Sequence, residues 1–157
     1  MQLSNPALLK QQVFIDGQWV DAADQKSFAV TNPATAQVIA HVPSVSTAQV
    51  EHAVEAADEA LKTWKLTTAK ERSILLKKWY QLMVEHQEDL AIILSTEQGK
   101  SITESRGEIL YGASFIEWFA EEAKRTYGDV IPHDKQGRRL VVIRQPVGVV
   151  AAITPWN

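Results

Sequence analysis

The chain has 157 residues with 45% hydrophobic and 22% charged side chains, which is the composition of a globular protein with a core of its own. Its 16 basic and 19 acidic residues leave a net charge of −3, which argues against a nucleic acid or an anionic membrane as partner. No stretch approaches the roughly 18 consecutive apolar residues of a membrane span, and the first residues lack the features of a secretory signal. We therefore expect a cytoplasmic protein.

Residue types that bind metals or attack carbonyl groups are scarce. There are no cysteines, which excludes disulfides, thiolate metal sites and a cysteine nucleophile within these residues. The four histidines never have the spacing that would place two of them on one metal ion, so we expect no metal site. They are His41, His52, His86 and His133.

The first 45 residues carry strand and turn signals. Asp16 and Gly17 lie between two apolar and aromatic runs, and this dipeptide is typical of a two-residue hairpin turn. Residues 28–31 and 38–42 have strand character on either side of a turn at 32–35. We predict that residues 1–45 form an amino-terminal hairpin and a small antiparallel sheet, preceded by a loose arm or a short helix.

Residues 46–132 are predicted to be helical. The second helical stripe is too long for one ordinary helix, so we expect a break near His86. Gly99 is the predicted C-cap of the following helix, and a third segment is predicted to continue to Gly128. Three capping boxes, in which a Ser or Thr is followed three residues later by Gln or Glu, mark the helix starts. They begin at Ser46, Thr68 and Ser101.

The third helical segment is apolar on two sides. One stripe consists mainly of small and aliphatic side chains, and the other of bulky aromatic ones. A helix of this kind is either buried on both sides or turns one side to a pocket. The pattern alone favours burial, and a pocket wall is the alternative. The aromatic stripe comprises Tyr111, Phe115, Trp118 and Phe119.

Residues 133–148 contain one predicted strand, at 138–145, after a polar turn at 134–137. Arginines lie at both ends of this strand. They could clamp a substrate carboxylate. At the ends of an edge strand, however, they are better explained as protection against pairing with another chain. They are Arg138, Arg139 and Arg144.

The last residues, 149–157, begin with a continuous apolar run at 149–153, which is typical of a parallel strand buried on both faces. Ligands of open α/β sheets bind just past the carboxyl end of such strands. Residues 154–157 are therefore either a ligand-facing loop or an ordinary loop with its Trp in a core, and spacing alone favours the second. A parallel strand needs neighbours that this chain does not supply, so we expect the amino-terminal piece of a longer protein.

Seven short motifs, spread over nearly the whole chain, carry a family resemblance. They lie at residues 14–19, 31–35, 97–100, 107–122, 127–129, 145–149 and 153–157. In this order they resemble the amino-terminal part of the aldehyde dehydrogenase superfamily, and within it the bacterial succinate-semialdehyde dehydrogenases. The implied fold is α/β, with a small antiparallel sheet, long helices, a bridging strand at 133–148 and, at 149–157, the first strand of a Rossmann-like parallel sheet.

The resemblance implies oxidation of succinate semialdehyde to succinate with NADP or NAD as cofactor. In such enzymes a cysteine thiolate adds to the aldehyde, hydrogen bonds hold the oxyanion, hydride passes to the cofactor, and a glutamate-activated water releases the acid. Asn157 matches the asparagine of the oxyanion hole. The cysteine and the glutamate would lie further along the chain, so we expect the 157 residues alone to be inactive.

The resemblance also implies two binding surfaces and an assembly. The parent protein is expected to bind a small aldehyde and to form a homo-oligomer, either a dimer or a tetramer. Its substrate tunnel is expected to pass Tyr111, Phe115 and Trp118. The segment beside the ribose and nicotinamide of the cofactor is expected to comprise Ile153, Thr154, Pro155 and Trp156.

Two other functions stay open. A sibling enzyme acting on glutarate semialdehyde or betaine aldehyde would share these motifs. If the 157 residues are the complete product, a non-catalytic binding or assembly module is the alternative, and the strands at 138–145 and 149–153 would dock on its partner.

Overall fold

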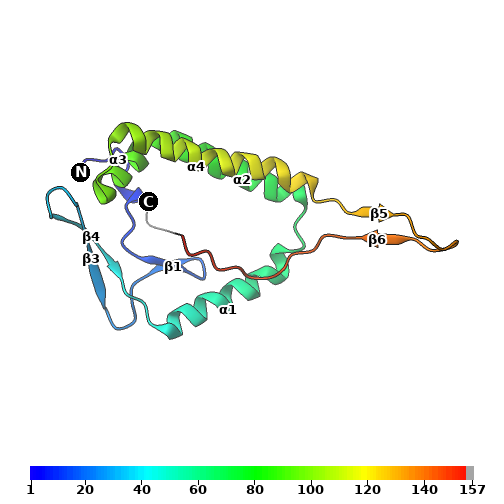
Figure 1. Cartoon of the computed structure of the whole chain (residues 1–157). Coiled ribbons are helices and arrows are strands. Elements are labelled where there is room, and N and C mark those ends of the chain that lie inside the picture. Colours follow the sequence, from blue (N-terminus) through cyan, green and yellow to red (C-terminus); the bar gives the residue numbers. More distant parts are fainter. Residues whose placement is uncertain (155–157) are drawn as a thin grey trace.

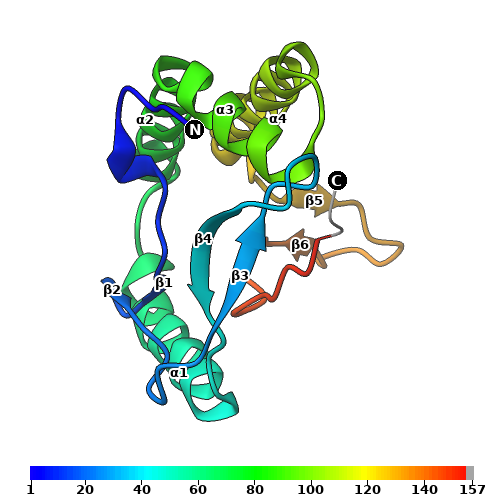
Figure 2. The same cartoon turned by 90° about the vertical axis from the view of Figure 1, so that its left-hand side faces the viewer.

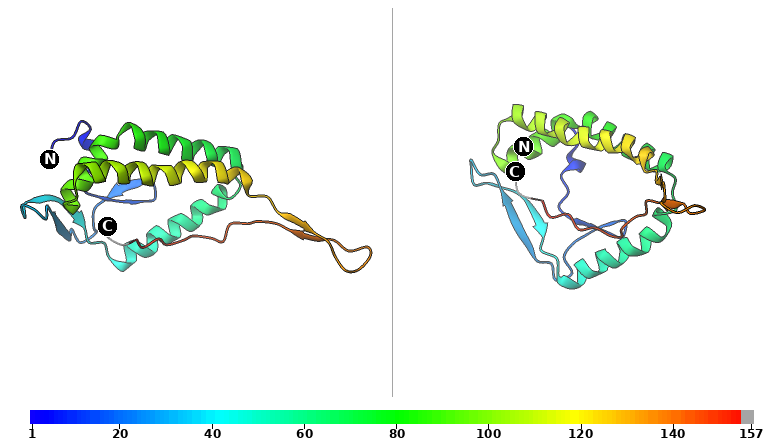
Figure 3. Two further views of the ribbon diagram at one scale, coloured as in Figure 1. Left: turned by 45° about the horizontal axis from the view of Figure 1, so that its top comes forward. Right: turned by 45° about the vertical axis from the view of Figure 1, so that its right-hand side comes forward.

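Four α-helices and three two-stranded sheets make up the part of the chain that this computed structural model describes, residues 1–154. Three helices form one layer, α1 lies apart from that layer, and a long hairpin projects from the rest (Figures 1 and 3). The layer consists of α2 (Ala69–Glu85), α3 (Gln87–Gln98) and α4 (Ile102–Glu122); α1 spans Thr47–Trp64, and the hairpin consists of β5 (Asp129–Ile131) and β6 (Leu140–Val142).

The amino-terminal strands form two separate hairpins (Figure 2). β1 (Val13–Ile15) pairs with β2 (Gln18–Val20) across the predicted turn, and β3 (Ser27–Thr31) pairs with β4 (Val38–Pro43). This agrees with the hairpin and small antiparallel sheet predicted for residues 1–45. The residues between the two hairpins are held by α1, because the Gln49 side chain accepts from Ala23 N at 3.0 Å and donates to Asp21 O at 3.1 Å.

All three predicted capping boxes are present. Ser46, Thr68 and Ser101 each accept from the backbone N–H three residues on, and the Gln or Glu at that position bonds back to the cap residue. The break between α2 and α3 falls at His86, which has φ −100° and ψ 17°. Gly99 ends α3 in the left-handed region, at φ 77°. These helix boundaries were therefore predicted correctly.

Small side chains form the core of the helical layer. α4 packs against α2 and α3, and the residues buried in this layer are short, so the helix backbones approach closely. The larger apolar side chains of the layer lie nearer its surface. The buried residues are Ser73, Ala91, Ser105, Ala113 and Ala120, together with the carboxylate of Asp89.

α4 ends earlier than predicted. It stops at Glu122 and continues only as a 3₁₀ turn, Ala123–Arg125, so the prediction of helix up to Gly128 is wrong. Gly128 leads into β5 instead, and a Cβ there would lie 1.9 Å from the carbonyl oxygen of Val142 on the partner strand. The glycine permits close approach of two strands, and it does not cap a helix.

The hairpin of β5 and β6 is antiparallel, with Val130 opposite Val141. β6 is shorter than the strand predicted at 138–145. β5 was not predicted, and it lies within residues 46–132, which were predicted to be helical. Both strands are exposed along their whole length.

The stretch 143–154 has no strand structure and is exposed throughout. The parallel strand predicted at 149–153 is therefore not formed. Its side chains include Val150 at 72% and Ile153 at 97% exposure. A strand exists only where a neighbour pairs with it, and none of the six strands between residues 1 and 154 pairs with this segment. No helix of the described residues is long and apolar enough to cross a bilayer.

Candidate functional site

The aromatic stripe of α4 is exposed. Its four rings range from 47% exposed at Phe115 to 66% exposed at Tyr111, whereas Ala113 and Ala120 on the other stripe are fully buried. Burial of both sides, which the sequence pattern favoured, is therefore not found in residues 1–154. The rings of Tyr111 and Phe115 pack edge to face. Their centroids lie 4.9 Å apart, and the angle between the ring planes is 79°.

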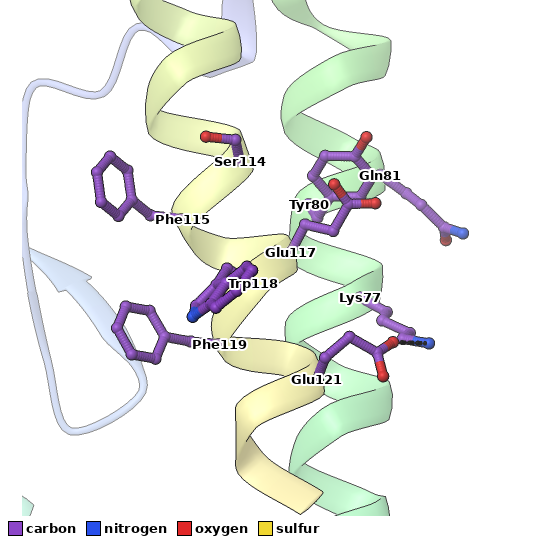
Figure 4. A pocket seen from close by; sticks show the side chains of 9 residues that line it. All are labelled: Lys77, Tyr80, Gln81, Ser114, Phe115, Glu117, Trp118, Phe119 and Glu121. Atoms are coloured by element: carbon purple, nitrogen blue, oxygen red, sulfur yellow. Dashed lines mark ion pairs between the residues drawn. The ribbon is translucent and has the colours of Figure 1, made fainter. Parts of the chain in front are cut away.

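A cavity of about 860 Å³ lies along α2 and α4 (Figure 4). Phe115 and Trp118, two of the three predicted substrate residues, line it, but Tyr111 does not. In Figure 4 the rings of Phe115 and Phe119 project from the side of α4 that faces away from α2. The cavity therefore has an aromatic side, formed by α4, and a polar side that α2 and α4 share.

On the polar side, one carboxylate forms ion pairs with two ammonium groups. Glu121 lies 2.7 Å from Lys124 Nζ and 2.6 Å from Lys77 Nζ. The hydrogen bond from Lys124, followed by that from Lys77, lowers the pKa of Glu121 to about 2. Glu121 is therefore ionised at neutral pH and neutralises Lys77. The cavity suits an aliphatic chain or a ring, and its one lysine is already paired with an acid.

The predicted cofactor segment is described only in part. Ile153 and Thr154 are both exposed, at the end of the extended stretch. Pro155, Trp156 and Asn157, the last of which is the predicted oxyanion donor, lie outside the described residues. Of the described part of this segment, neither Ile153 nor Thr154 lines the α2–α4 cavity.

α2 contributes Lys77, Tyr80 and Gln81 to this cavity, and none of the three was predicted as a site residue. The short connections between the helices could have indicated that α2 lies beside α4. Helices joined by short connections pack side by side, and only α3 separates α2 from α4. Which side chains of α2 line the cavity could not have been inferred from this. Among residues 1–154 no group of three or more His, Asp or Glu side chains is placed to hold a metal ion.

A similar fold is found in a solved aldehyde dehydrogenase from Brucella melitensis biovar abortus. The match covers 94% of this chain and 30% of that one, with a TM-score of 0.92 and 53% sequence identity. The fold is thus that of the amino-terminal part of an aldehyde dehydrogenase. Residues 19–157 match the aldehyde dehydrogenase family. The chain belongs to this family.

Two curated relatives match the chain over all 157 residues. A glutarate-semialdehyde dehydrogenase from Pseudomonas putida is 57% identical, with 100% of this chain matching 33% of the relative. A succinate-semialdehyde dehydrogenase [NADP(+)] from Escherichia coli is 50% identical, with the same coverage of 100% and 33%. The chain therefore spans about a third of the length of these relatives.

Proposed function

We propose that the whole protein oxidises succinate semialdehyde to succinate, with NADP or NAD as cofactor. The observation that carries this proposal is the identity of 50% and 57%, over the whole chain, to dehydrogenases named for succinate and glutarate semialdehyde. Both substrates are short aldehydes with a carboxylate at the far end, and they differ by one methylene group. The substrate class is therefore a dicarboxylic acid semialdehyde.

The aromatic wall of α4 is proposed to contact the methylene chain of the substrate. Phe115 and Trp118 line the α2–α4 cavity and are exposed, and apolar contacts with such side chains orient a short chain. Since Lys77 is paired with Glu121, the cation that recognises the carboxylate is expected from residues outside this cavity.

Ile153 and Thr154 have side chains of the chemical types that can contact a nicotinamide nucleotide. They present an exposed apolar side chain and an exposed hydroxyl, which can hydrogen-bond to a ribose. We propose that they hold the cofactor together with Pro155 and Trp156. When bound, the cofactor accepts the hydride from the substrate. The chain's own contribution at this point is to bind and orient.

Asn157 is proposed to donate a side-chain N–H to the oxyanion that forms when a thiolate adds to the aldehyde. Replacing it with Ala should lower kcat by about 10²–10³-fold, the loss measured for one oxyanion donor in a comparable site. Asn157→Asp is the near-isosteric second variant, and it should be at least as slow because it offers no donor. Single-turnover kinetics on the full-length protein check this. An Asp variant as fast as the wild type would exclude the role.

The substrate proposal is tested on the full-length protein with a panel of succinate semialdehyde, glutarate semialdehyde and betaine aldehyde, each with NAD+ and NADP+. We expect kcat/KM for succinate semialdehyde to exceed that for betaine aldehyde, which carries a positive charge, by about 10²-fold or more. Preference for betaine aldehyde would contradict the substrate class.

Glutarate semialdehyde is the second candidate, because the relative named for it is 57% identical to this chain. One extra methylene group changes kcat/KM by roughly 10- to 200-fold in a fitted pocket. The same panel therefore separates the two acids. A higher kcat/KM for the longer one would replace succinate with glutarate semialdehyde and leave the substrate class intact.

A further inference from the structure

A second cavity, of about 390 Å³, lies where three distant parts of the chain meet. The last turn of α1 and the first turn of α2 form one side, and Thr126 and the start of the extended stretch at 144–148 form the other. In Figure 1 this stretch passes the junction of α1 and α2. We call this the junction cavity.

Three of the nine residues that line the junction cavity are basic, and none is acidic. They are Lys65, Arg72 and Arg144, in a chain whose net charge is −3. None of the three takes part in an ion pair between residues 1 and 154. Like charges that share one cavity repel each other, so the arrangement favours an anion between them.

The acid next to Arg72 in the sequence, Glu71, is engaged elsewhere. The Glu71 carboxylate accepts from Thr68 N at 2.7 Å and from Thr68 Oγ1 at 2.8 Å, which closes the capping box of α2. These hydrogen bonds, and to a smaller extent the charge of Arg72, lower the pKa of Glu71. Glu71 thus serves the helix cap and does not line the cavity.

Both guanidinium groups are fixed by the backbone. Arg72 Nη1 donates to the carbonyl oxygen of Thr67, and Arg144 Nε donates to the carbonyl oxygen of Tyr127 at 3.0 Å. Each guanidinium has five N–H donors in a rigid fork, so each keeps donors for a ligand. Fixing the groups beforehand reduces the entropy that a ligand must overcome.

We propose that the junction cavity binds a small polyvalent oxyanion of the phosphate type. A planar fork matches two phosphate oxygens at once, and Lys65 adds a compact third charge. Three cations exceed the single charge of a carboxylate, which favours phosphate over a monocarboxylic acid. Trp64 and Leu61 provide an apolar wall beside the charges, so the cavity suits both free phosphate and a phosphate attached to a nucleoside.

The test is titration calorimetry of the full-length protein with inorganic phosphate and, in a second arm, with ADP. Chloride at matched ionic strength is the blank. We expect saturable binding of phosphate that weakens as ionic strength rises. Binding should weaken about tenfold in Lys65→Gln and in Arg144→Gln, since each removes one charge-assisted contact. Tighter binding of ADP with the same sensitivity to both variants would identify a nucleotide as the ligand.

Arg139→Gln, directly before β6 and outside the cavity, is the matched control and should bind like the wild type. Arg72 also holds the backbone of Thr67, so it is left intact. Circular dichroism melts confirm that each variant is folded. Absence of saturable phosphate binding, or binding that neither Lys65→Gln nor Arg144→Gln weakens, would overturn the proposal. Neither result depends on aldehyde oxidation.

Discussion

Asp89 ties the amino-terminal arm to the helical layer. Its carboxyl group is buried, at 4% exposure, and it accepts from Ser4 N at 2.8 Å and from Asn5 N at 2.7 Å. Two backbone donors converge on one side chain, and only an acid offers an acceptor to each of them.

Asp89→Asn should lower the free energy of unfolding by roughly 1–3 kcal/mol, because its amide turns a donor toward one backbone N–H and leaves both groups unsatisfied. Urea denaturation measures this loss, and limited proteolysis should cut the variant first before residue 12. The exposed Asp58→Asn on α1 is the control. Equal stability of the two variants would show that the arm is not held by Asp89.

Gly99 has a conformation and a neighbour that both exclude a side chain. Its φ is 77°, and a Cβ there would lie 2.8 Å from Cγ of Pro33 at the tip of the β3–β4 hairpin. Gly99→Ala should therefore destabilise the protein by at least about 1 kcal/mol.

Gly107→Ala is the matched comparison, because Gly107 is inside α4 and nothing lies within 4 Å of its added Cβ. This variant should gain up to about 1 kcal/mol from helix propensity. Thermal denaturation shows whether each variant is more or less stable than the wild type. A stabilised Gly99→Ala variant would contradict the close contact with Pro33.

At the scale of elements, Glu121 joins α4 to α2 through Lys77. Its pKa is about 2 in the folded chain, below the ordinary 4.5. A carboxyl group whose pKa is lowered by folding stabilises the folded state at any pH above its pKa in the unfolded chain. This stabilisation is lost as the pH falls toward 2, the pKa of Glu121 in the folded chain. The wild type should therefore lose more stability than Glu121→Gln between pH 4.5 and pH 2.

Melting temperatures across this pH range check the prediction, and added salt should reduce the difference because the pair is exposed. Glu117→Gln, also on the cavity rim, is the control. Parallel pH profiles for the wild type and Glu121→Gln would indicate that the ion pairs contribute nothing to the packing of α2 and α4.

The helix starts could be predicted because each depends on residues three apart. A hydroxyl at Ser46, Thr68 or Ser101 and an acceptor on the next turn suffice to fix the first turn. The end of α4 could not be predicted in this way. The role of Gly128 is set by the carbonyl of Val142, fourteen positions further along, and no local pattern records such a contact.

Of the candidate site, only the part that lies on a single helix could be predicted. The spacing of Tyr111, Phe115 and Trp118 places the three rings along one helix, as observed. The Lys77–Glu121 pair depends on how two helices pack, and the alternation of residue types does not specify that packing. The functional role of each ring, and of Asn157, was inferred from the family resemblance and stays a prediction.

In the molecule as a whole, the strand that was predicted at 149–153 and is not formed shows what a residue pattern omits. Five apolar residues predict burial, but burial needs a second surface, and the described residues offer none to Val150 or Ile153. The residue types of a strand can be recognised within the segment itself, but the strand forms only when a segment elsewhere in the chain pairs with it.

The isolated 157-residue chain should therefore self-associate through exposed apolar segments, one in β6 and one in the extended stretch at 143–154. Val141 and Val150, which are 67% and 72% exposed, lie on such segments. The double variant Val141→Lys and Val150→Lys should shift the chain toward monomer in sedimentation velocity, because charged edges resist pairing. Gln136→Lys in the hairpin turn is the control. A monomeric wild-type chain would contradict this prediction.

The anchoring of the arm on Asp89 also bears on the order of folding. The hydrogen bond from Ser4 to Asp89 spans 85 positions, whereas α2, α3 and α4 follow one another with short connections. Contacts between sequence neighbours close small loops and form early, and distant ones form later. We expect the helical layer to form first and the arm to dock last. In native-state hydrogen exchange, the amides of Ser4 and Asn5 should then exchange well before those of α4, in an opening step that leaves the layer folded.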